Sequence, residues 1–122
     1  MVKLLIVDDD LPTSDYLQNF FSKRDYEVFV ANEGKSALAI VKEKRPSIVL
    51  LDIRMPGPSG IKVLQQIKEI DKNIKVIMMT GVDEKVVMDL AKESGAADYI
   101  TKPFSLENLE NNVIPKILKQ LL

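Results

Sequence analysis

The chain has 122 residues, enough for one domain with a single hydrophobic core. Its 17 basic and 18 acidic residues give a net charge of −1, so no basic surface predicts direct binding to nucleic acid. Cysteine and histidine are both absent, which excludes disulfides, thiol catalysis, a histidine base and metal sites built on either residue.

From the N-terminus, the chain alternates short apolar segments with segments of helical periodicity. Residues 3–7 predict a buried strand, and Asp10 can cap the helix after it. Residues 27–31 predict a less apolar strand near a sheet edge, after which Asn32 opens a helix that ends at Pro46. The residues expected on the inward faces of these two helices are Leu17, Phe20, Phe21, Ala37, Leu38 and Val41.

Residues 48–52 form the strand around which the rest of the chain is organised. Its apolar part shows no polar alternation, so both of its faces should be covered, as in a parallel sheet between two helix layers. The prolines and glycine of 55–58 predict a turn, which leaves Asp52 at the tip of the strand. Ser59 then caps the next helix.

Two further strand and helix units complete the chain. Residues 75–80 predict the fourth strand, followed by a helix that starts at Asp83 and stops at Gly95. Residues 98–101 predict a short fifth strand, and Ser105 opens the last helix. The inward-facing residues of the three later helices are expected to be Val63, Leu64, Ile67, Ile70, Val87, Leu90, Ala91, Leu106, Leu109, Val113, Ile117 and Leu121.

Five strands alternating with five helices predict an α/β fold. With right-handed crossovers this is a flavodoxin-like (βα)5 arrangement, a doubly wound five-stranded parallel sheet with strand order 2-1-3-4-5. No linker, low-complexity stretch or short repeat interrupts the chain, so we expect one domain over residues 1–122. No apolar run approaches the roughly 20 residues that cross a bilayer, and we expect a cytoplasmic protein without membrane contact.

Polar side chains stand at the carboxyl ends of four predicted strands. Asp8 and Asp9 come directly after the first strand, Asp52 ends the third, Thr80 ends the fourth, and Lys102 comes after the fifth. Ligand sites of open α/β sheets lie at such ends, so these five side chains should meet in one crevice. Three carboxylates repel one another, and a divalent cation held by oxygen, such as Mg²⁺, would relieve that repulsion.

This combination of groups suits phosphoryl transfer. A carboxylate can act as a nucleophile and form an acyl phosphate, and the reaction needs mainly positioning and charge neutralisation. Mg²⁺, Lys102 and the hydroxyl of Thr80 could supply that neutralisation. Gly81 would leave room for the phosphoryl group.

Four motifs together resemble those of the receiver domain of two-component response regulators. They are Val7-Asp-Asp-Asp10, Leu51-Asp-Ile-Arg-Met-Pro-Gly57, Met79-Thr-Gly81 and Tyr99-Ile-Thr-Lys-Pro-Phe104. Each motif is weak alone, but the four occur in order, at the spacing usual in the family, and the resemblance spans the whole chain. It implies a signalling receiver rather than an enzyme that acts on external substrates.

The resemblance also implies a role for each site residue. Asp52 is the expected phosphoacceptor. Asp9 is expected to bind Mg²⁺ directly and Asp8 through water, with the backbone carbonyl of Arg54 as a further ligand beside Asp52. Thr80 is expected to bind phosphoryl oxygens.

Further roles implied by the resemblance concern the fifth strand and the Lys-Pro pair after it. Lys102 is expected to bind phosphoryl oxygens, and its bond to Pro103 is expected to be cis. Thr80 and Tyr99 are expected to form a switch, in which the hydroxyl moves toward the phosphate and the ring turns inward. The face made by the fourth helix, fifth strand and fifth helix would then change its partner preference.

The implied partners are a sensor histidine kinase or a histidine phosphotransfer protein, and a downstream target or output domain. The chain has no histidine of its own, so it cannot contain the phosphoryl donor itself. The implied state is a monomer or a phosphorylation-dependent dimer. Pro115 lies inside the final helix and predicts a kink or break near 113–115, which would alter the face through which many relatives dimerise.

Three other functions compete with this interpretation. A phosphatase of the haloacid dehalogenase type usually has a second aspartate two residues after its nucleophile, where this chain has Arg54. A flavodoxin-like carrier of FMN needs a hydroxyl-rich and glycine-rich phosphate loop after the first strand, where 8–10 is acidic. A receiver that serves only for docking would not need all five site residues, which this chain retains.

Overall fold

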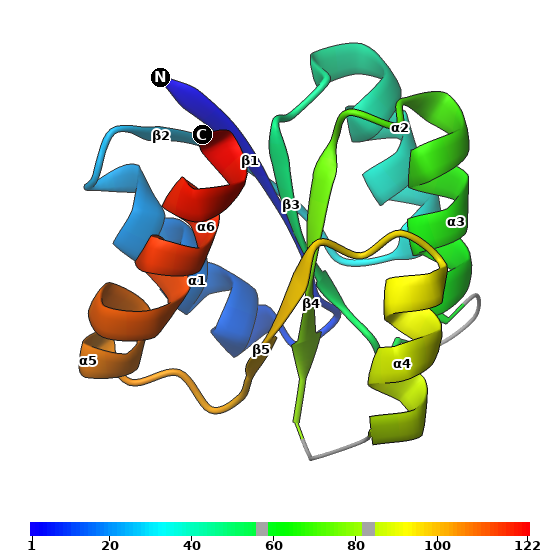
Figure 1. The fold of residues 1–122 in the computed structure, drawn as a ribbon. Helices are drawn as coiled ribbons and strands as arrows, with labels where there is room; N and C mark the ends of the chain where they lie inside the picture. Colours follow the sequence, from blue (N-terminus) through cyan, green and yellow to red (C-terminus); the bar gives the residue numbers. More distant parts are fainter. Residues whose placement is uncertain (56–58, 82–84) are drawn as a thin grey trace.

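The sheet has the strand order predicted from the sequence. The computed structural model describes residues 1–55, 59–81 and 85–122. Five parallel strands pair in the order β2-β1-β3-β4-β5, with β2 at one edge (Figure 1). The strands are β1 (Val2–Val7), β2 (Tyr26–Ala31), β3 (Ile48–Asp52), β4 (Lys75–Thr80) and β5 (Asp98–Thr101). Residues 56–58 of the predicted turn at 55–58 and the predicted helix start at Asp83 lie outside the described residues.

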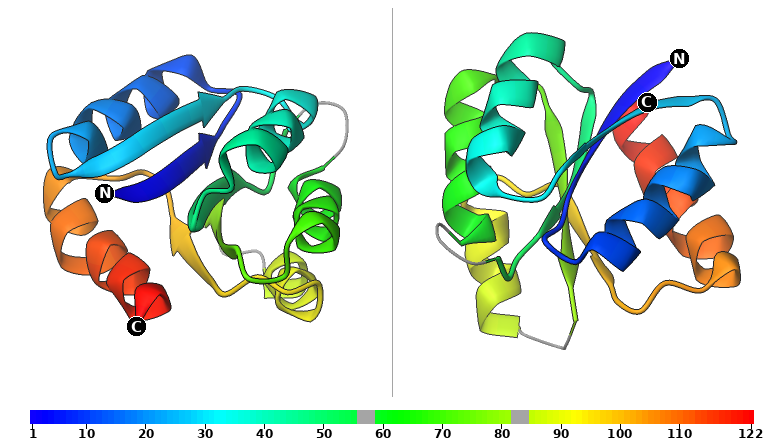
Figure 2. Two further views of the ribbon diagram at one scale, coloured as in Figure 1. Left: turned by 90° about the horizontal axis from the view of Figure 1, so that it is seen from above. Right: turned by 180° about the vertical axis from the view of Figure 1, so that it is seen from behind.

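Helices cover both faces of this sheet, which confirms the flavodoxin-like fold class. The helical segments are α1 (Leu11–Ser22), α2 (Gly34–Lys44), α3 (Gly60–Ile70), α4 (Lys85–Glu93), α5 (Leu106–Asn108), the π-turn η1 (Leu109–Val113) and α6 (Ile114–Leu121). One face is covered by α1, α5 and α6, and the other by α2, α3 and α4 (Figures 1 and 2). Within the described ranges, no helix has the length and apolar character required to cross a bilayer.

The central strand β3 shows why the chain folds in three layers. Side chains of a strand alternate between faces. Ile48 and Leu50 therefore pack with α1 and the last helix, while Val49 and Leu51 pack with α2 and α3. All four are fully buried, as the run without polar alternation predicted. Burying apolar area on both faces supplies the main stabilisation of such a sheet.

Three predicted helix caps are confirmed. The side chain of Asp10 accepts a hydrogen bond from Thr13 N at 3.2 Å, which caps α1. Ser59 caps α3 through Lys62 N at 3.4 Å. Ser105 caps α5 through Asn108 N at 3.0 Å. Each cap lies at the carboxyl end of the sheet, so it fixes where a loop beside the site turns into a helix.

The prediction that Asn32 opens the second helix is wrong. Helix α2 begins at Gly34, and Glu33 stands in the cap position without a side-chain hydrogen bond. The amide of Asn32 instead donates to Asp8 O at 2.7 Å and to the buried Ser14 Oγ at 3.3 Å. The side chain of Asn32 therefore forms its hydrogen bond with the backbone carbonyl at the end of β1 and does not cap α2.

Three residues predicted to face inward are exposed rather than buried. The exposed fractions are 47% for Leu90, 58% for Leu106 and 37% for Leu121. Leu90 belongs to α4, where only Ala91 is fully buried, so the apolar stripe of that helix is narrower than its sequence predicts. Leu106 and Leu121 occupy the first and last turns of the final helix, where fewer neighbours are available for packing.

The final helix departs from α geometry before Pro115 rather than breaking there. Residues Leu109–Val113 form a π-turn, in which Ile114 N donates to Leu109 O five residues back. Helical structure then continues through α6. Proline cannot donate the hydrogen bond of a regular helix, and its ring approaches the carbonyl four residues earlier. A widened turn accommodates these constraints, so the predicted irregularity exists but takes the form of a π-turn.

Candidate functional site: acidic side chains at the carboxyl end of the sheet

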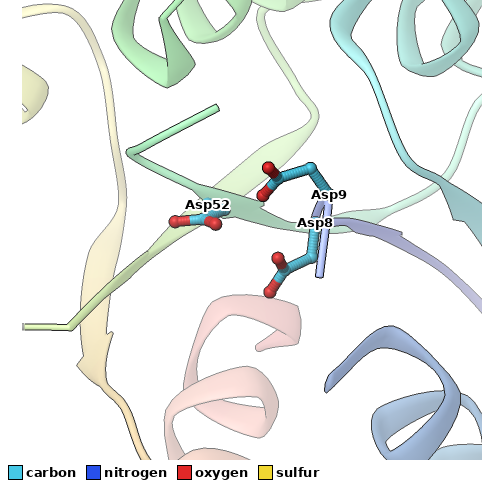
Figure 3. Close-up of side chains that lie close together, drawn as sticks. All are labelled: Asp8, Asp9 and Asp52. Atoms are coloured by element: carbon cyan, nitrogen blue, oxygen red, sulfur yellow. The ribbon is translucent and has the colours of Figure 1, made fainter. Parts of the chain in front are cut away.

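Three carboxylates gather where β1 and β3 end. Asp8 and Asp9 come directly after β1, and Asp52 is the last residue of β3, which is adjacent to β1 in the sheet. One carboxylate oxygen from each residue lies within 4.8 Å of the other two (Figure 3). Asp8 is fully buried and Asp52 is only 7% exposed, whereas Asp9 is exposed. The predicted acidic cluster is therefore assembled by the strand order of the sheet.

The position of Asp8 is fixed by neighbouring backbone groups. Its N–H donates to Ala31 O at 3.1 Å, which extends the β1–β2 pairing by one residue. Its Oδ1 accepts a hydrogen bond from Asp10 N at 3.0 Å. Asn32 binds the carbonyl of Asp8 on the other side. These backbone hydrogen bonds hold the carboxylate of Asp8 in place at the end of β1.

Asp52 is held by the loop after it and by the start of α3. Its Oδ1 accepts a hydrogen bond from Arg54 N at 3.1 Å. Gly60 N donates to Ile53 O at 3.0 Å, which packs the first turn of α3 against the strand end. A Cβ on Gly60 would lie 2.2 Å from Asp52 O, a distance that no real contact has. Only glycine fits there, so Gly60 supports the geometry of the site without contacting its carboxylates.

Lys102 provides the cation of the cluster. Its Nζ lies 2.7 Å from Asp8 Oδ2 and 3.3 Å from Asp52 Oδ2. Its backbone N donates to Thr80 O at 2.7 Å, and the Lys102–Pro103 peptide bond is cis. The side chain therefore reaches the acids from the end of β5, across the end of β4.

The electrostatics of the cluster raise the pKa of one acid above its usual value. Burial and the negative charge of Asp8 raise the pKa of Asp52 to about 6, although Lys102 and the N–H of Arg54 oppose the shift. Burial lowers the pKa of Lys102, but its contact with Asp8 and the charges of both acids outweigh burial and leave this pKa above its usual value. One ammonium thus cannot fully neutralise the carboxylates around it.

The other predicted functional residues lie on β4 and β5. Thr80 ends β4 and is only 3% exposed. Tyr99 lies on β5, where its half-buried ring packs against the core beneath α2, α3 and α4. A Cβ on Gly81 would meet no atom within 4 Å, so there is open space beside the end of β4. Thr80 therefore adjoins the acidic cluster through Lys102, while Tyr99 lies one strand further out.

The sequence of residues 4–114 matches the family pattern of the response regulator receiver domain. The chain belongs to this family. It is 41% identical over 111 residues to sporulation initiation phosphotransferase F of Bacillus subtilis, with 91% of this chain and 90% of that protein covered. The chain is therefore a receiver domain of the two-component response regulator type, as its motifs indicated.

Solved structures show the same likeness in three dimensions. A CheY-like response regulator receiver domain protein from Methanospirillum hungatei is 27% identical, with a TM-score of 0.90 over 99% of this chain and 97% of that one. NtrX from Brucella abortus is 28% identical, with a TM-score of 0.89 over 98% of this chain but only 28% of that chain. The similar fold makes up nearly all of the Methanospirillum hungatei chain but only part of the longer NtrX chain.

The donor set of this receiver domain fits a hard divalent cation. Lys102 is an ion-pair partner of Asp8 Oδ2. Yet among the described residues no donor meets hydrogen-bond geometry at this fully buried oxygen. Mg²⁺ takes oxygen ligands and is usually held by one or two carboxylates together with water, so this cluster offers suitable donors. Asp8, Asp9 and Asp52 could therefore hold a metal ion.

Sequence reasoning missed two residues that support the site. Gly60 could have been recognised as a glycine in the first turn after a cap, where a close approach of backbone is common. For Asn32 the sequence predicts the start of a helix, because nothing local in it reveals a contact with Ser14 and Asp8. Asn32 contacts the backbone carbonyl of Asp8, and Gly60 lies against the backbone carbonyl of Asp52, so both support the backbone of an acidic residue.

Proposed function

We propose that this receiver domain accepts a phosphoryl group on Asp52 in a Mg²⁺-dependent reaction. The observation that carries the proposal is the burial of Asp52 beside Asp8 with Lys102 Nζ 3.3 Å from its Oδ2. A buried carboxylate with a pKa of about 6 is mostly ionised at pH 7, so it can act as a nucleophile. Lys102 stands where it can bind oxygens of a group attached to Asp52.

The proposed step transfers phosphorus from a phosphohistidine to a carboxylate. An Oδ atom of Asp52 attacks phosphorus, the new O–P bond forms, and the N–P bond breaks. The electron pair of the broken bond stays on the imidazole nitrogen, which takes up a proton. In this proposal a sensor kinase or phosphotransfer protein supplies the donor histidine, since residues 1–122 contain none.

Each remaining site residue has a separate role in this proposal. When bound, Mg²⁺ offsets the negative charge of the acids and of the incoming phosphoryl group. Asp9 and the carbonyl of Arg54 would bind it directly beside Asp52, and Asp8 would bind it through water. The hydroxyl of Thr80 would bind a phosphoryl oxygen from the end of β4.

The proposed output is a switch on the face formed by α4, β5 and α5. Thr80 would move toward the phosphoryl group, and the ring of Tyr99 would turn inward behind it. The changed face would then control a downstream target or an attached output domain, in a monomer or in a phosphorylation-dependent dimer. The relative from Bacillus subtilis is named a phosphotransferase, which supports a role in passing phosphoryl groups between proteins.

The proposal limits the chemistry to the chain's own phosphorylation and dephosphorylation. A phosphatase of the haloacid dehalogenase type is not supported, since the family match is to receiver domains and Arg54 replaces the usual second aspartate. We therefore expect no steady turnover when an unactivated phosphomonoester is added.

Intact-mass spectrometry tests the proposal. The protein is incubated with Mg²⁺ and a small acyl phosphate, and its mass should rise by one phosphoryl group. EDTA and Asp52→Asn should each abolish the gain, while Asp71→Asn at the other end of the sheet should leave it unchanged. An unmodified wild-type mass, under conditions that phosphorylate a known receiver, would overturn the proposal.

A further inference from the structure

The final helix contains a register shift that the proposed phosphoacceptor role does not explain. Leu109 and Lys116 are seven residues apart, a spacing that places both on one face of a regular α-helix. Leu109 is fully buried, so a regular helix would direct Lys116 toward the apolar core. The π-turn inserts one extra residue into this interval, which rotates the rest of the helix by about 100°.

Ile117 takes the core position as a result of this rotation. It is fully buried, like Leu109 and Val113, and the three residues are spaced by four along the chain. A spacing of four matches a turn wider than the 3.6 residues of an α-helix. The π-turn is therefore consistent with the spacing of the three buried residues. It also directs the side chain of Lys116 away from the apolar core.

Lys116 is directed to β5, where it makes three contacts. Its Nζ donates to Tyr99 O at 2.8 Å. It also lies 3.6 Å from Asp98 Oδ1 and 5.1 Å from the centroid of the Tyr99 ring. The side chain of Lys116 is 28% exposed, so the ammonium is partly shielded from water. A cation at this distance over an aromatic face is attracted to it.

These contacts differ in what they restrain. The hydrogen bond to Tyr99 O holds the backbone of the edge strand and does not depend on where the ring points. The contact between ammonium and ring exists only for the Tyr99 orientation seen here. Because Tyr99 is only half-buried here, the energy of this contact favours the present orientation over one in which the ring has turned further inward.

We infer that Lys116 is a positioning residue of the Tyr99 switch, placed over the ring by the π-turn at Leu109–Val113. The inference rests on the proposed function, in which Tyr99 turns inward when Asp52 carries a phosphoryl group. Lys116 opposes that movement, and so it sets how readily the phosphorylated state forms. Thermodynamic linkage then requires that removing the cation–ring contact strengthens binding of a phosphoryl analogue at Asp52.

Beryllofluoride with Mg²⁺ serves as the analogue, with affinity measured by NMR titration. Lys116→Met keeps the length of the side chain but removes its charge, and it should bind the analogue about 2- to 5-fold more tightly than wild type. Lys116→Arg retains a cation and should remain close to wild type. Lys119→Met, at an exposed lysine of the same helix, is the matched control and should change nothing.

Two further experiments distinguish a role of Lys116 in positioning the Tyr99 ring from a purely structural role. In a Tyr99→Leu background, Lys116→Met should no longer alter the affinity, because the ring it acts on is gone. In the analogue-free protein, side-chain couplings of Tyr99 should show a changed χ1 population in Lys116→Met. Unchanged χ1 populations together with an affinity equal to that of Lys119→Met would overturn the inference.

Failure of the proposed function gives a different pattern. If wild type does not bind the analogue but Lys116→Met changes the χ1 population of Tyr99, then the contact positions the ring and the phosphoacceptor role is wrong. If wild type binds the analogue and Lys116→Met does so equally well, then the phosphoacceptor role stands and the role of Lys116 is wrong.

Discussion

The two ends of the sheet both carry ion pairs, but they differ in exposure. At the amino end, Arg45 lies 3.6 Å from Asp71, with side chains 54% and 28% exposed. At the carboxyl end, Lys102 contacts Asp8 and Asp52, whose side chains are 0% and 9% exposed. An exposed pair contributes roughly 0–1 kcal/mol to stability, whereas buried charges cost several kcal/mol unless they are fully paired. The buried charges at the carboxyl end therefore lower the stability of the fold, and a functional site is expected at that end.

The largest expected effect comes from removing the partly buried ammonium of Lys102. Lys102→Met leaves two buried acids without their ion-pair partner, so the free energy of unfolding at pH 8 should fall by about 3–5 kcal/mol. Arg45→Met is the control at the exposed end and should cost less than about 1 kcal/mol. Urea denaturation in EDTA measures both. Equal losses at the two ends would mean that burial does not distinguish them.

Next in size is the effect of removing the charge of Asp52. Its pKa is about 6 in the folded protein and 3.8 in the unfolded chain. Because the folded pKa is the higher one, the stability contributed by the protonated acid is fully present below pH 3.8 and is lost as the pH rises toward 6. Asp52→Asn keeps a neutral side chain, so in EDTA above pH 6 it should be more stable than wild type by about 1–3 kcal/mol.

The pH profile supplies the control for this prediction. The advantage of Asp52→Asn should shrink steadily as the pH is lowered from 6 to 4, because wild type then becomes protonated. Asp71→Asn, in the exposed pair, should show no comparable gain at any pH. A gain for Asp52→Asn that is the same at pH 4 and pH 8 would exclude the electrostatic cause.

A third prediction compares two glycines near the site. Gly60→Ala places a Cβ against Asp52 O, and backbone cannot move away cheaply, so we expect a loss of about 1–3 kcal/mol in the free energy of unfolding. Gly81→Ala meets no atom within 4 Å and should leave stability nearly unchanged. Thermal denaturation distinguishes them. If Gly60→Ala proved as stable as Gly81→Ala, the start of α3 would not hold the end of β3 as described.

The smallest effect concerns magnesium. A ligand that binds only the folded protein stabilises it by about 1.4 kcal/mol when its concentration is ten times its dissociation constant. Wild type should gain this stability with Mg²⁺. Asp9→Asn should lose most of the gain, yet match wild type in EDTA because Asp9 is exposed. An undiminished gain in Asp9→Asn would remove Asp9 from the metal site.

The two ends also show what the sequence could and could not predict about the fold. Strand order and layers were predictable because the run from Ile48 to Leu51 has no polar alternation and is buried on both faces. Caps formed by Ser59 and Ser105 were predictable because their hydrogen bonds are local. The burial of Leu90 and Leu106 was predicted wrongly, since periodicity gives the direction of a side chain but not how many neighbours it meets. The π-turn was anticipated only as a proline kink.

The candidate site also has features that the sequence predicts and features that it does not. The approach of Asp8, Asp9 and Asp52 could be predicted from strand ends in a known order, which sequence can provide. The contacts that hold these acids come from far along the chain, as with Asn32 at Asp8 O, or from close backbone approach, as with Gly60. No local pattern encodes the contact of Asn32, whereas the position of Gly60 directly after the cap residue Ser59 is a local signal. The contact of Lys116 with Tyr99 depends on the helix register, and it became visible only with the π-turn in place.

The central claim is that the acids at the ends of β1 and β3 share a magnesium ion, while Asp52 carries the phosphoryl group under Lys102 and Thr80. A crystal structure of the protein with Mg²⁺ and beryllofluoride tests this most directly. The account predicts one metal ion bound by Asp9, Asp52 and the carbonyl of Arg54, with beryllium attached to Asp52 and its fluorides contacted by Lys102 and Thr80. A metal ion bound elsewhere, or an Asp52 carboxylate left unmodified at saturating analogue, would contradict it.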